Sequence, residues 1–461
     1  MSSWVVDIKQ NGRFQTIFIS LIAAALFIAL AIWGGQPRGI STAVFLSGVI
    51  LLFLFTAAFA WLGWYLLIRP LPPGHKEPAG YTLAIPYRQL IASLMAISSL
   101  SLVVGLFWDE VWHRQYGIQF GEDFFWRPHQ LMYASFLITI LLAFYNLFYL
   151  MRQGRGTLQQ RFRTNPMLGW LVLVGGYMLF ALPADPIWHE IYGVDITAWS
   201  IPHIILLFSF ASISLIAAAL QGSTLPSRQW RNLTALKQMF EHFDLLTLFV
   251  IALTLNTWLQ VMTTDFEGLS LALLAARPVW SLPALIVAAS TFCGLLANHS
   301  LRITGAATII GLLNLGLRLL MQNTFGIPDM SASAWIIAVF PLITLDIWYF
   351  MQQQEQQPSF HWLAAGGAAS VGMALVGFSL INRFYIYPLI TNGNLFSMLF
   401  AVFVAASMAA WAGQRLGNYL ANQATGETAV SPTPLSLLSP ITLIGTIAFV
   451  IFFIVTATPP V

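Results

Sequence analysis

Two stretches of the chain repeat one arrangement of carboxylate and imidazole groups. Each has one aspartate and two histidines: Asp109, His113 and His129 in the first stretch, and Asp185, His189 and His203 in the second. In both stretches the aspartate precedes the first histidine by four residues, so the two side chains share one face of a helix. A histidine preceded by proline then follows after sixteen residues in the first stretch and fourteen in the second. One carboxylate with two imidazoles is a ligand set for a divalent transition metal, with coordination positions left open for water, oxygen or substrate.

The residues between these groups repeat as well. Trp, Tyr and Gly follow each aspartate at identical offsets, as Trp112, Tyr116 and Gly117 in the first stretch. Aromatic and histidine side chains gather at membrane interfaces without binding anything, but such a belt requires no fixed register. Duplication alone would preserve the register without a metal, yet it does not explain why carboxylates are kept in a costly apolar setting. The pattern therefore favours metal binding.

Further acids lie beside the six predicted ligands. We expect them to accept hydrogen bonds from imidazole ring N–H groups and so to orient the histidines; these acids are Glu110, Glu122, Asp123 and Glu190. Intrinsic affinity favours copper at a site of nitrogen and oxygen ligands, and zinc and ferrous iron are the alternatives.

Composition indicates that membrane-spanning helices position these ligands. Hydrophobic residues make up 58% of the 461 residues and charged residues only 8%, which is too little charge for a water-soluble surface of this size. Apolar runs of about 20 residues recur along the chain, each long enough to cross a bilayer as a helix. The net charge of +3 and the lack of a basic, aromatic-rich tract argue against nucleic acid as a partner. A single cysteine, Cys293, excludes an internal disulfide and a cysteine-based metal cage.

These features predict an all-α, polytopic integral membrane protein with about 13 transmembrane helices. The predicted spans cover residues 15–35, 42–68, 88–108, 129–151, 167–183, 203–221, 243–262, 280–297, 302–321, 333–351, 361–381, 394–412 and 439–458. Three regions are expected: an N-terminal two-span segment (1–87), a core carrying the duplicated Asp/His motif (88–222), and a C-terminal multi-span region (223–461). The first apolar run is interpreted as an anchor rather than a cleaved signal.

Basic residues predict the orientation of the spans. The N-terminus and the even-numbered connections hold twelve lysines and arginines, and the intervening connections hold three. The twelve are Lys9, Arg13, Arg69, Lys76, Arg88, Arg152, Arg155, Arg161, Arg163, Arg228, Arg231 and Lys237, and the three are Arg38, Arg114 and Arg127. Because cytoplasmic loops carry the excess of positive charge, we expect a cytoplasmic N-terminus in a bacterial-type inner membrane, with both motifs at the outer face. Two spans separate the motifs, so spans 3–4 and 5–6 are predicted to form a parallel repeat.

The stretch from Asp109 to Phe136 resembles the membrane-embedded C subunit of the copper membrane monooxygenases, the particulate methane and ammonia monooxygenase family. That subunit also carries an aspartate four residues before a Trp-preceded histidine, and a later histidine at the start of the next helix. Its second set includes two histidines fourteen residues apart, as His189 and His203 are here. The resemblance covers residues 90–220, approximately. It implies copper at both motifs, oxidation of a small apolar substrate by oxygen, other membrane subunits as partners, and a periplasmic electron donor.

Three other interpretations fit the same residues. The outer Asp/His clusters could capture metal for transport, or His129 and His203 could be axial ligands of a b-type haem in a quinol-linked subunit. The third is a structural subunit with a vestigial site. Separately, Asn314 and Arg318 share one face of an apolar run, and Asp346 is a candidate ion-pair partner for this arginine.

Overall fold

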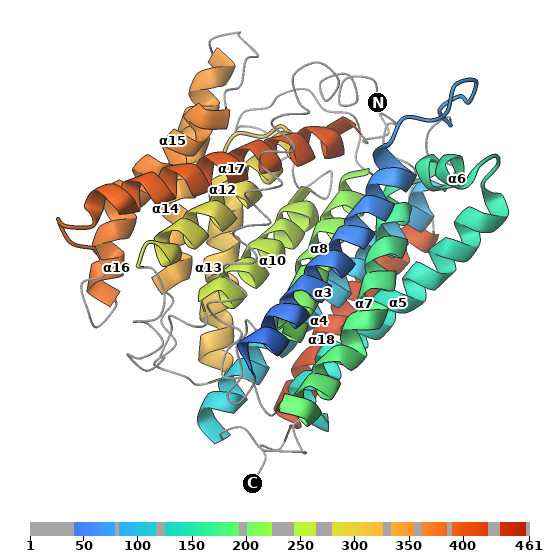
Figure 1. Cartoon of the computed structure of the whole chain (residues 1–461), viewed down its shortest axis with the longest axis horizontal. Helices are drawn as coiled ribbons and strands as arrows, with labels where there is room; N and C mark the ends of the chain where they lie inside the picture. Colours follow the sequence, from blue (N-terminus) through green and yellow to red (C-terminus); the bar gives the residue numbers. More distant parts are fainter. Residues whose placement is uncertain are drawn as a thin grey trace. The chain divides into compact units, whose positions relative to one another are not determined.

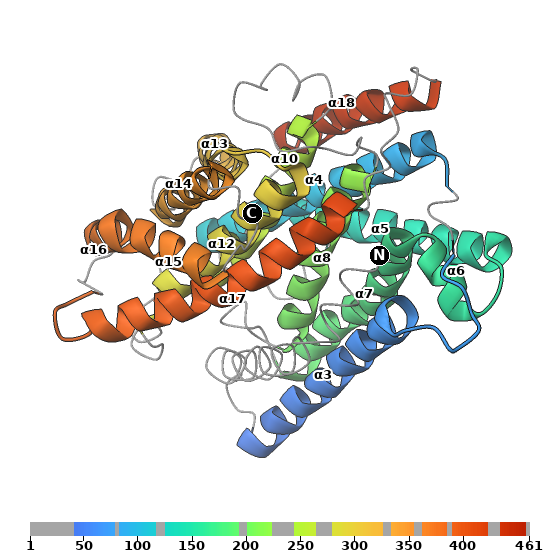
Figure 2. The same cartoon turned by 90° about the horizontal axis from the view of Figure 1, so that it is seen from above.

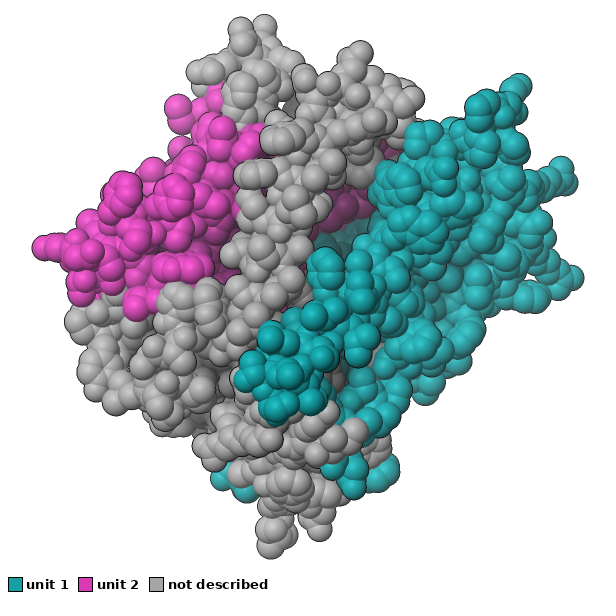
Figure 3. Space-filling view, in the orientation of Figure 1, with its two compact units in different colours: residues 1–220, 430–461 teal, residues 221–429 magenta. Residues whose placement is uncertain are grey.

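The computed structural model describes residues 41–78, 83–116, 125–192, 201–223, 244–263, 279–325, 333–354, 362–384, 390–422 and 434–457. Within these residues every element is helical, as Figure 1 shows. The chain divides into two compact units, coloured separately in Figure 3: unit 1 comprises residues 1–220 and 430–461, and unit 2 comprises residues 221–429. The last helix is grouped with the first unit.

Eight helices in the described part of the chain are long and apolar enough to cross a membrane. They cover Thr42–Ile68, Ile85–Trp112, Arg127–Gln153, Pro166–Trp188, Ser281–Leu301, Ala334–Gln352, Trp362–Arg383 and Leu395–Asn422. Two shorter apolar helices, Ser209–Ser223 and Thr247–Gln260, lie at other predicted spans. The chain is therefore an all-α, multi-pass integral membrane protein that associates with the lipid bilayer. The predicted span at 15–35 lies outside the described residues, so the total of thirteen stays a prediction.

Unit 1 is built around one long helix. Its elements are α3 (Thr42–Gly63), a π-helical turn (Trp64–Ile68), α4 (Ile85–Tyr116), α5 (Arg127–Gln153), α6 (Leu158–Thr164), α7 (Pro166–Tyr192), α8 (Ile201–Ser223) and α18 (Pro434–Val455). The most apolar window of α4 is 83% buried within the protein, whereas that of α3 is 17% buried. Because α5 and α18 both pack on α4, α4 is the central helix of the unit.

Hydroxyl groups join α4 to its neighbours. The Ser98 hydroxyl donates to the carbonyl of Ser135 in α5 at 2.7 Å and lies 2.9 Å from the Thr139 hydroxyl. The Ser99 hydroxyl makes a hydrogen bond with that of Ser214 in α8. Such bonds between helices stabilise a bundle in lipid, where packing gains little from the hydrophobic effect.

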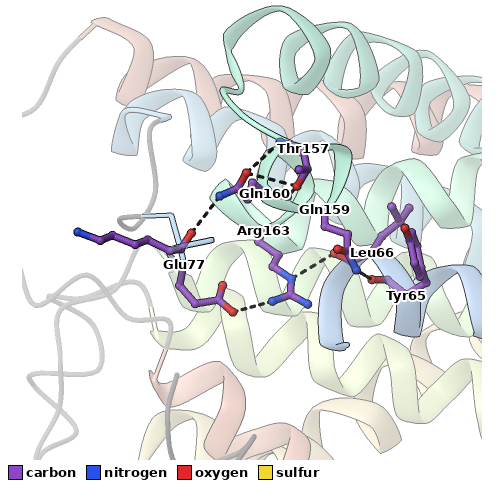
Figure 4. A network of polar contacts seen from close by, with 8 residues as sticks. Tyr65, Leu66, Glu77, Thr157, Gln159, Gln160 and Arg163 are labelled. Atoms are coloured by element: carbon purple, nitrogen blue, oxygen red, sulfur yellow. Dashed lines mark hydrogen bonds and ion pairs between the residues drawn. The ribbon is translucent and has the colours of Figure 1, made fainter. Parts of the chain in front are cut away.

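A polar network joins α6 to the π-helical turn after α3 and to Glu77, as Figure 4 shows. Arg163 in α6 forms a 2.6 Å ion pair with Glu77, and its Nε donates to the Leu66 carbonyl at 3.4 Å. Gln159 donates to the carbonyl of Tyr65 at 2.7 Å. These donors satisfy carbonyls at the C-terminal end of the π-helical turn, which would otherwise lack partners. The network thereby holds the basic connection between α5 and α7 against the end of α3.

Unit 2 contains α10 (Asp244–Thr263), α12 (Ser281–Leu301), α13 (Ala306–Phe325), α14 (Ser333–Gln354), α15 (Trp362–Gly372), a π-helical turn (Met373–Gly377), α16 (Phe378–Phe384) and α17 (Leu395–Asn422). Helices α12 and α17 lie side by side in Figure 1 and Figure 2. Glycines allow this close approach: a Cβ added at Gly413 would collide with the backbone of Phe292, and one at Gly417 would lie 2.6 Å from the His299 Cβ. Small residues that bring helix backbones together are typical of membrane helix pairs.

The expected ion pair between Asp346 and Arg318 is corrected by the turn between α12 and α13. Asp346 in α14 accepts hydrogen bonds from the backbone N–H groups of Gly305 at 3.1 Å and Thr308 at 2.6 Å, so its carboxylate caps the N-terminus of α13. Arg318 lies ten residues beyond Thr308, about 15 Å further along the helix. Asp346 is therefore a helix cap and not the direct partner of Arg318. Its carboxylate is bound to N–H groups at the start of α13, whereas Arg318 lies further along that helix.

Candidate metal centre

Each Asp/His motif spans the junction of two helices in unit 1. Asp109 lies seven residues before the end of α4, and His129 is the third residue of α5. Asp185 lies seven residues before the end of α7, and His203 is the third residue of α8. Pro128 and Pro202 are each the second residue of the returning helix, where the missing N–H costs no intrahelical bond. The two hairpins thus carry their acid and histidine at equivalent positions.

In both hairpins the carboxylate meets the imidazole across the junction. Oδ1 of Asp109 lies 2.8 Å from Nε2 of His129, and Oδ1 of Asp185 lies 3.5 Å from Nε2 of His203. Ligand atoms bind such a metal ion at about 2.0–2.1 Å. If the ligand–metal–ligand angle lies between a right angle and the tetrahedral angle, the two ligand atoms are about 2.8–3.4 Å apart. The observed separations are close to this range. A metal ion therefore fits between the paired atoms.

The predicted third ligands, His113 and His189, have side chains outside the part that the structure describes. Their backbone is helical, because α4 continues to Tyr116 and α7 to Tyr192. One helical turn thus separates each of these positions from its aspartate. Among the described residues, no group of three His, Cys, Asp or Glu side chains forms a metal-binding arrangement. Two of the three predicted ligands are brought together in each hairpin, and the third stays a prediction.

The structure does not show the predicted supporting acids in contact with the predicted histidine ligands. Glu122 and Asp123 lie outside the described residues. Glu110 is half-buried and Glu190 is exposed. Each directly follows a predicted ligand, so it projects about 100° further round the helix than that ligand. Their role in orienting the histidines stays a prediction.

Aromatic rings enclose the first pair. Trp112 packs edge-on against Trp108 and Trp126, with ring centroids 5.0 and 5.9 Å apart. His129 lies between Trp126, at 6.5 Å, and Tyr133, at 5.9 Å. The three tryptophans are all buried. The side chains of Asp109 and His129 are only 17% exposed, and this partial shielding from water strengthens electrostatic interactions there.

Sequence reasoning missed one contributor to this wall. Phe453 of α18 packs edge-on against Trp108, with centroids 6.2 Å apart. The guanidinium carbon of Arg127, two residues before His129, lies 4.6 Å from the centre of the Phe453 ring. Nothing in the sequence marked Phe453, because it is one aromatic residue in an otherwise ordinary apolar span.

The second pair lies in a more open setting. The side chains of Asp185 and His203 are 25% and 31% exposed, against 17% for both Asp109 and His129. Two prolines flank Asp185 within α7, at positions 183 and 186. Prolines inside a helix remove backbone hydrogen bonds and loosen the turn before them. The two sites are thus alike in layout but differ in access to solvent.

No protein-family model, curated protein or solved structure matches the chain. The resemblance to the copper monooxygenase subunit therefore rests on the spacing of the Asp/His motifs, and the function is argued from the geometry of the two hairpins.

Proposed function

We propose that the chain is a copper-binding membrane protein that serves as the oxygen-activating component of a monooxygenase. The observation that carries the proposal is the Asp109–His129 pair, 2.8 Å apart inside an aromatic wall. A bound copper ion would supply redox chemistry with oxygen. Zinc and iron are the alternative metals for the same donors.

Different residues would bind the metal and line the pocket at this site. Asp109 and His129 would hold the metal together with His113, which lies one turn after Asp109 in α4. The buried tryptophans would exclude water and provide an apolar surface for a small apolar substrate arriving from the lipid. Metal binding requires a neutral imidazole and an ionised carboxylate, so copper affinity would fall at low pH, where protons compete for these ligands.

The matched hairpins support an internal repeat. Because α4–α5 and α7–α8 place their Asp and His at equivalent positions, we propose that they are parallel copies of one two-helix unit. The basic residues around Arg163 lie at the far end of α5 from His129, a separation of about 40 Å along the helix. By the positive-inside rule this arrangement favours a cytoplasmic basic end and a metal site at the outer face. An electron donor on the periplasmic side and further membrane subunits would complete the enzyme.

One observation favours a second function. The more exposed Asp185–His203 pair suits reversible capture of a metal ion from the outer solution, as a metal-handling protein would require. The haem alternative receives less support, because Nε2 of His129 and Nε2 of His203, the usual haem-facing atoms, point at carboxylates.

Metal content of the purified full chain tests the proposal. Copper bound at the first hairpin should be lost from an Asp109→Asn, His129→Ala double variant, which leaves the second hairpin intact, and all copper should be retained in a His75→Ala variant, since His75 is exposed and lies outside both hairpins. Electron paramagnetic resonance of the loaded protein should show nitrogen ligation. If the double variant keeps all of its copper with an unchanged spectrum, the proposed site is wrong. Metal uptake by proteoliposomes without oxygen consumption would favour the metal-handling function instead.

A further inference from the structure

The C-terminal end of α5 carries a group of basic side chains. Arg152 and Arg155 are both exposed there. Arg161 of α6 lies against the same turn: its Nη1 donates to the Met151 carbonyl at 2.7 Å, and its Nε donates to the Gly156 carbonyl at 3.2 Å. Three arginines therefore gather where α5 ends, and we call them the arginine cluster.

The two helices that carry this cluster contain no acid that could neutralise it. The sequence has no Asp or Glu between residues 124 and 184. Glu77, which lies beside α6, is paired with Arg163 at 2.6 Å. The amide of Gln160 donates to the Lys76 carbonyl at 3.1 Å, so the exposed Lys76 adds a further positive charge near the start of α6. This end of unit 1 is therefore rich in positive charge.

An apolar stripe leads away from the arginine cluster along α5. Four large apolar side chains at spacings of three or four residues are each more than half exposed: Leu137, Leu141, Phe144 and Phe148. Helical periodicity puts them on one face, over a length of about 16 Å. This length is close to half of a hydrocarbon core of about 30 Å. The guanidinium carbon of Arg152 lies 5.7 Å from the centre of the Phe148 ring, so the arginine stands at the end of the stripe.

We infer that this end of α5 binds an anionic phospholipid, with the headgroup phosphate at the arginine cluster and an acyl chain along the apolar stripe. Basic residues next to a membrane span attract anionic headgroups, and arginine matches phosphate oxygens through paired hydrogen bonds. An exposed apolar stripe alone would accept any lipid chain. The stripe and the cluster together favour a lipid that has both long chains and a net negative charge.

Lipid binding to the full chain in a neutral detergent tests the inference, with native mass spectrometry as the readout. The probes are dioleoyl phosphatidylglycerol and dioleoyl phosphatidylcholine, which have the same chains but differ in net charge. The parent protein should bind the anionic lipid more tightly, and this preference should shrink as the salt concentration is raised. Glycerol 3-phosphate has the anionic group without the chains, so it should not displace phosphatidylglycerol at equal concentration.

Variants test whether the lipid lies on α5. Arg152→Gln and Arg155→Gln should each weaken phosphatidylglycerol binding about fivefold, because one basic residue near the membrane surface contributes a factor of this size. Phosphatidylcholine binding should weaken less. Arg152→Lys keeps the charge and should retain most of the preference, whereas Phe148→Ala should weaken the binding of both lipids. The matched controls in unit 2 are Arg383→Gln, at an exposed arginine, and Phe396→Ala, at a phenylalanine that is 83% exposed; both should bind lipid as the parent does.

The inference is overturned if the parent binds the two phospholipids equally well. It is also overturned if Arg152→Gln and Arg155→Gln keep the same preference as Arg383→Gln. Displacement of phosphatidylglycerol by glycerol 3-phosphate at equal concentration would overturn it too, because the cluster would then be a site for a free anion. Copper content is a separate readout, so failure here leaves the proposed metal site untouched.

Discussion

His129 and Asp109 face each other across the junction of α4 and α5, with Nε2 and Oδ1 2.8 Å apart. The corresponding atoms of His203 and Asp185 are 3.5 Å apart in a more exposed hairpin. Two sites of one layout are therefore expected to differ in strength, because a pair shielded from water interacts more strongly with a charge placed between its members.

Replacing Asp109 by Asn should weaken copper binding more than replacing Asp185 by Asn. Loss of the carboxylate charge weakens metal binding more where the site is better shielded from water. We expect the copper affinity of the first site to fall by at least about tenfold. Competition against a chromophoric copper chelator would measure both variants. Equal losses at the two sites would contradict the difference in shielding.

Replacing Phe453 by Ala should loosen the wall of the first site. Phe453 contacts both Trp108 and Arg127, and the aromatic and cation–π contacts together contribute about 1–2 kcal/mol. We expect a lower melting temperature and a changed copper spectrum. The matched control is Phe452→Ala, since Phe452 is 64% exposed. The assigned role of Phe453 would be wrong if both variants had the same copper spectrum as the parent.

Replacing Gly413 by Ala should destabilise unit 2, because the added methyl group would collide with the Phe292 backbone. Overpacking of this kind costs about 1–3 kcal/mol. Gly316→Ala is the control: no atom lies within 4 Å of its added Cβ, so it should be neutral or stabilise α13 through the higher helix propensity of alanine. Denaturant unfolding in detergent would compare the two, and equal stabilities would argue against the close α12–α17 contact.

Replacing Asp346 by Ala should destabilise the α12–α13 turn. The carboxylate accepts hydrogen bonds from two backbone N–H groups at the start of α13, and loss of such a cap costs about 0.5–2 kcal/mol. Asp346→Asn keeps one acceptor oxygen and should cost less. Hydrogen exchange at Gly305 and Thr308 would report the effect locally. Unchanged protection in the alanine variant would contradict the cap.

Several features were predictable because they depend on local sequence. The low charge and the recurring apolar runs indicated a helical membrane protein, since each span must satisfy its own backbone hydrogen bonds in lipid. The i, i+4 spacing and the proline before each later histidine predicted that Asp109 and His129 would meet at one end of a hairpin. Helical periodicity likewise placed Asn314 on the same face as Arg318.

Other features were decided by tertiary packing. The contact of Phe453 with the metal-site wall joins residues more than three hundred positions apart in sequence, and no local pattern selects one aromatic residue of an apolar span for it. Asp346 caps α13 instead of pairing with Arg318, because the turn brings two N–H donors to its carboxylate. The unequal exposure of the two Asp/His pairs is also set by tertiary packing, since the two motifs have the same local pattern. Spacing along a helix determines which groups share a face, whereas the packing of distant helices determines which of those groups are shielded from water.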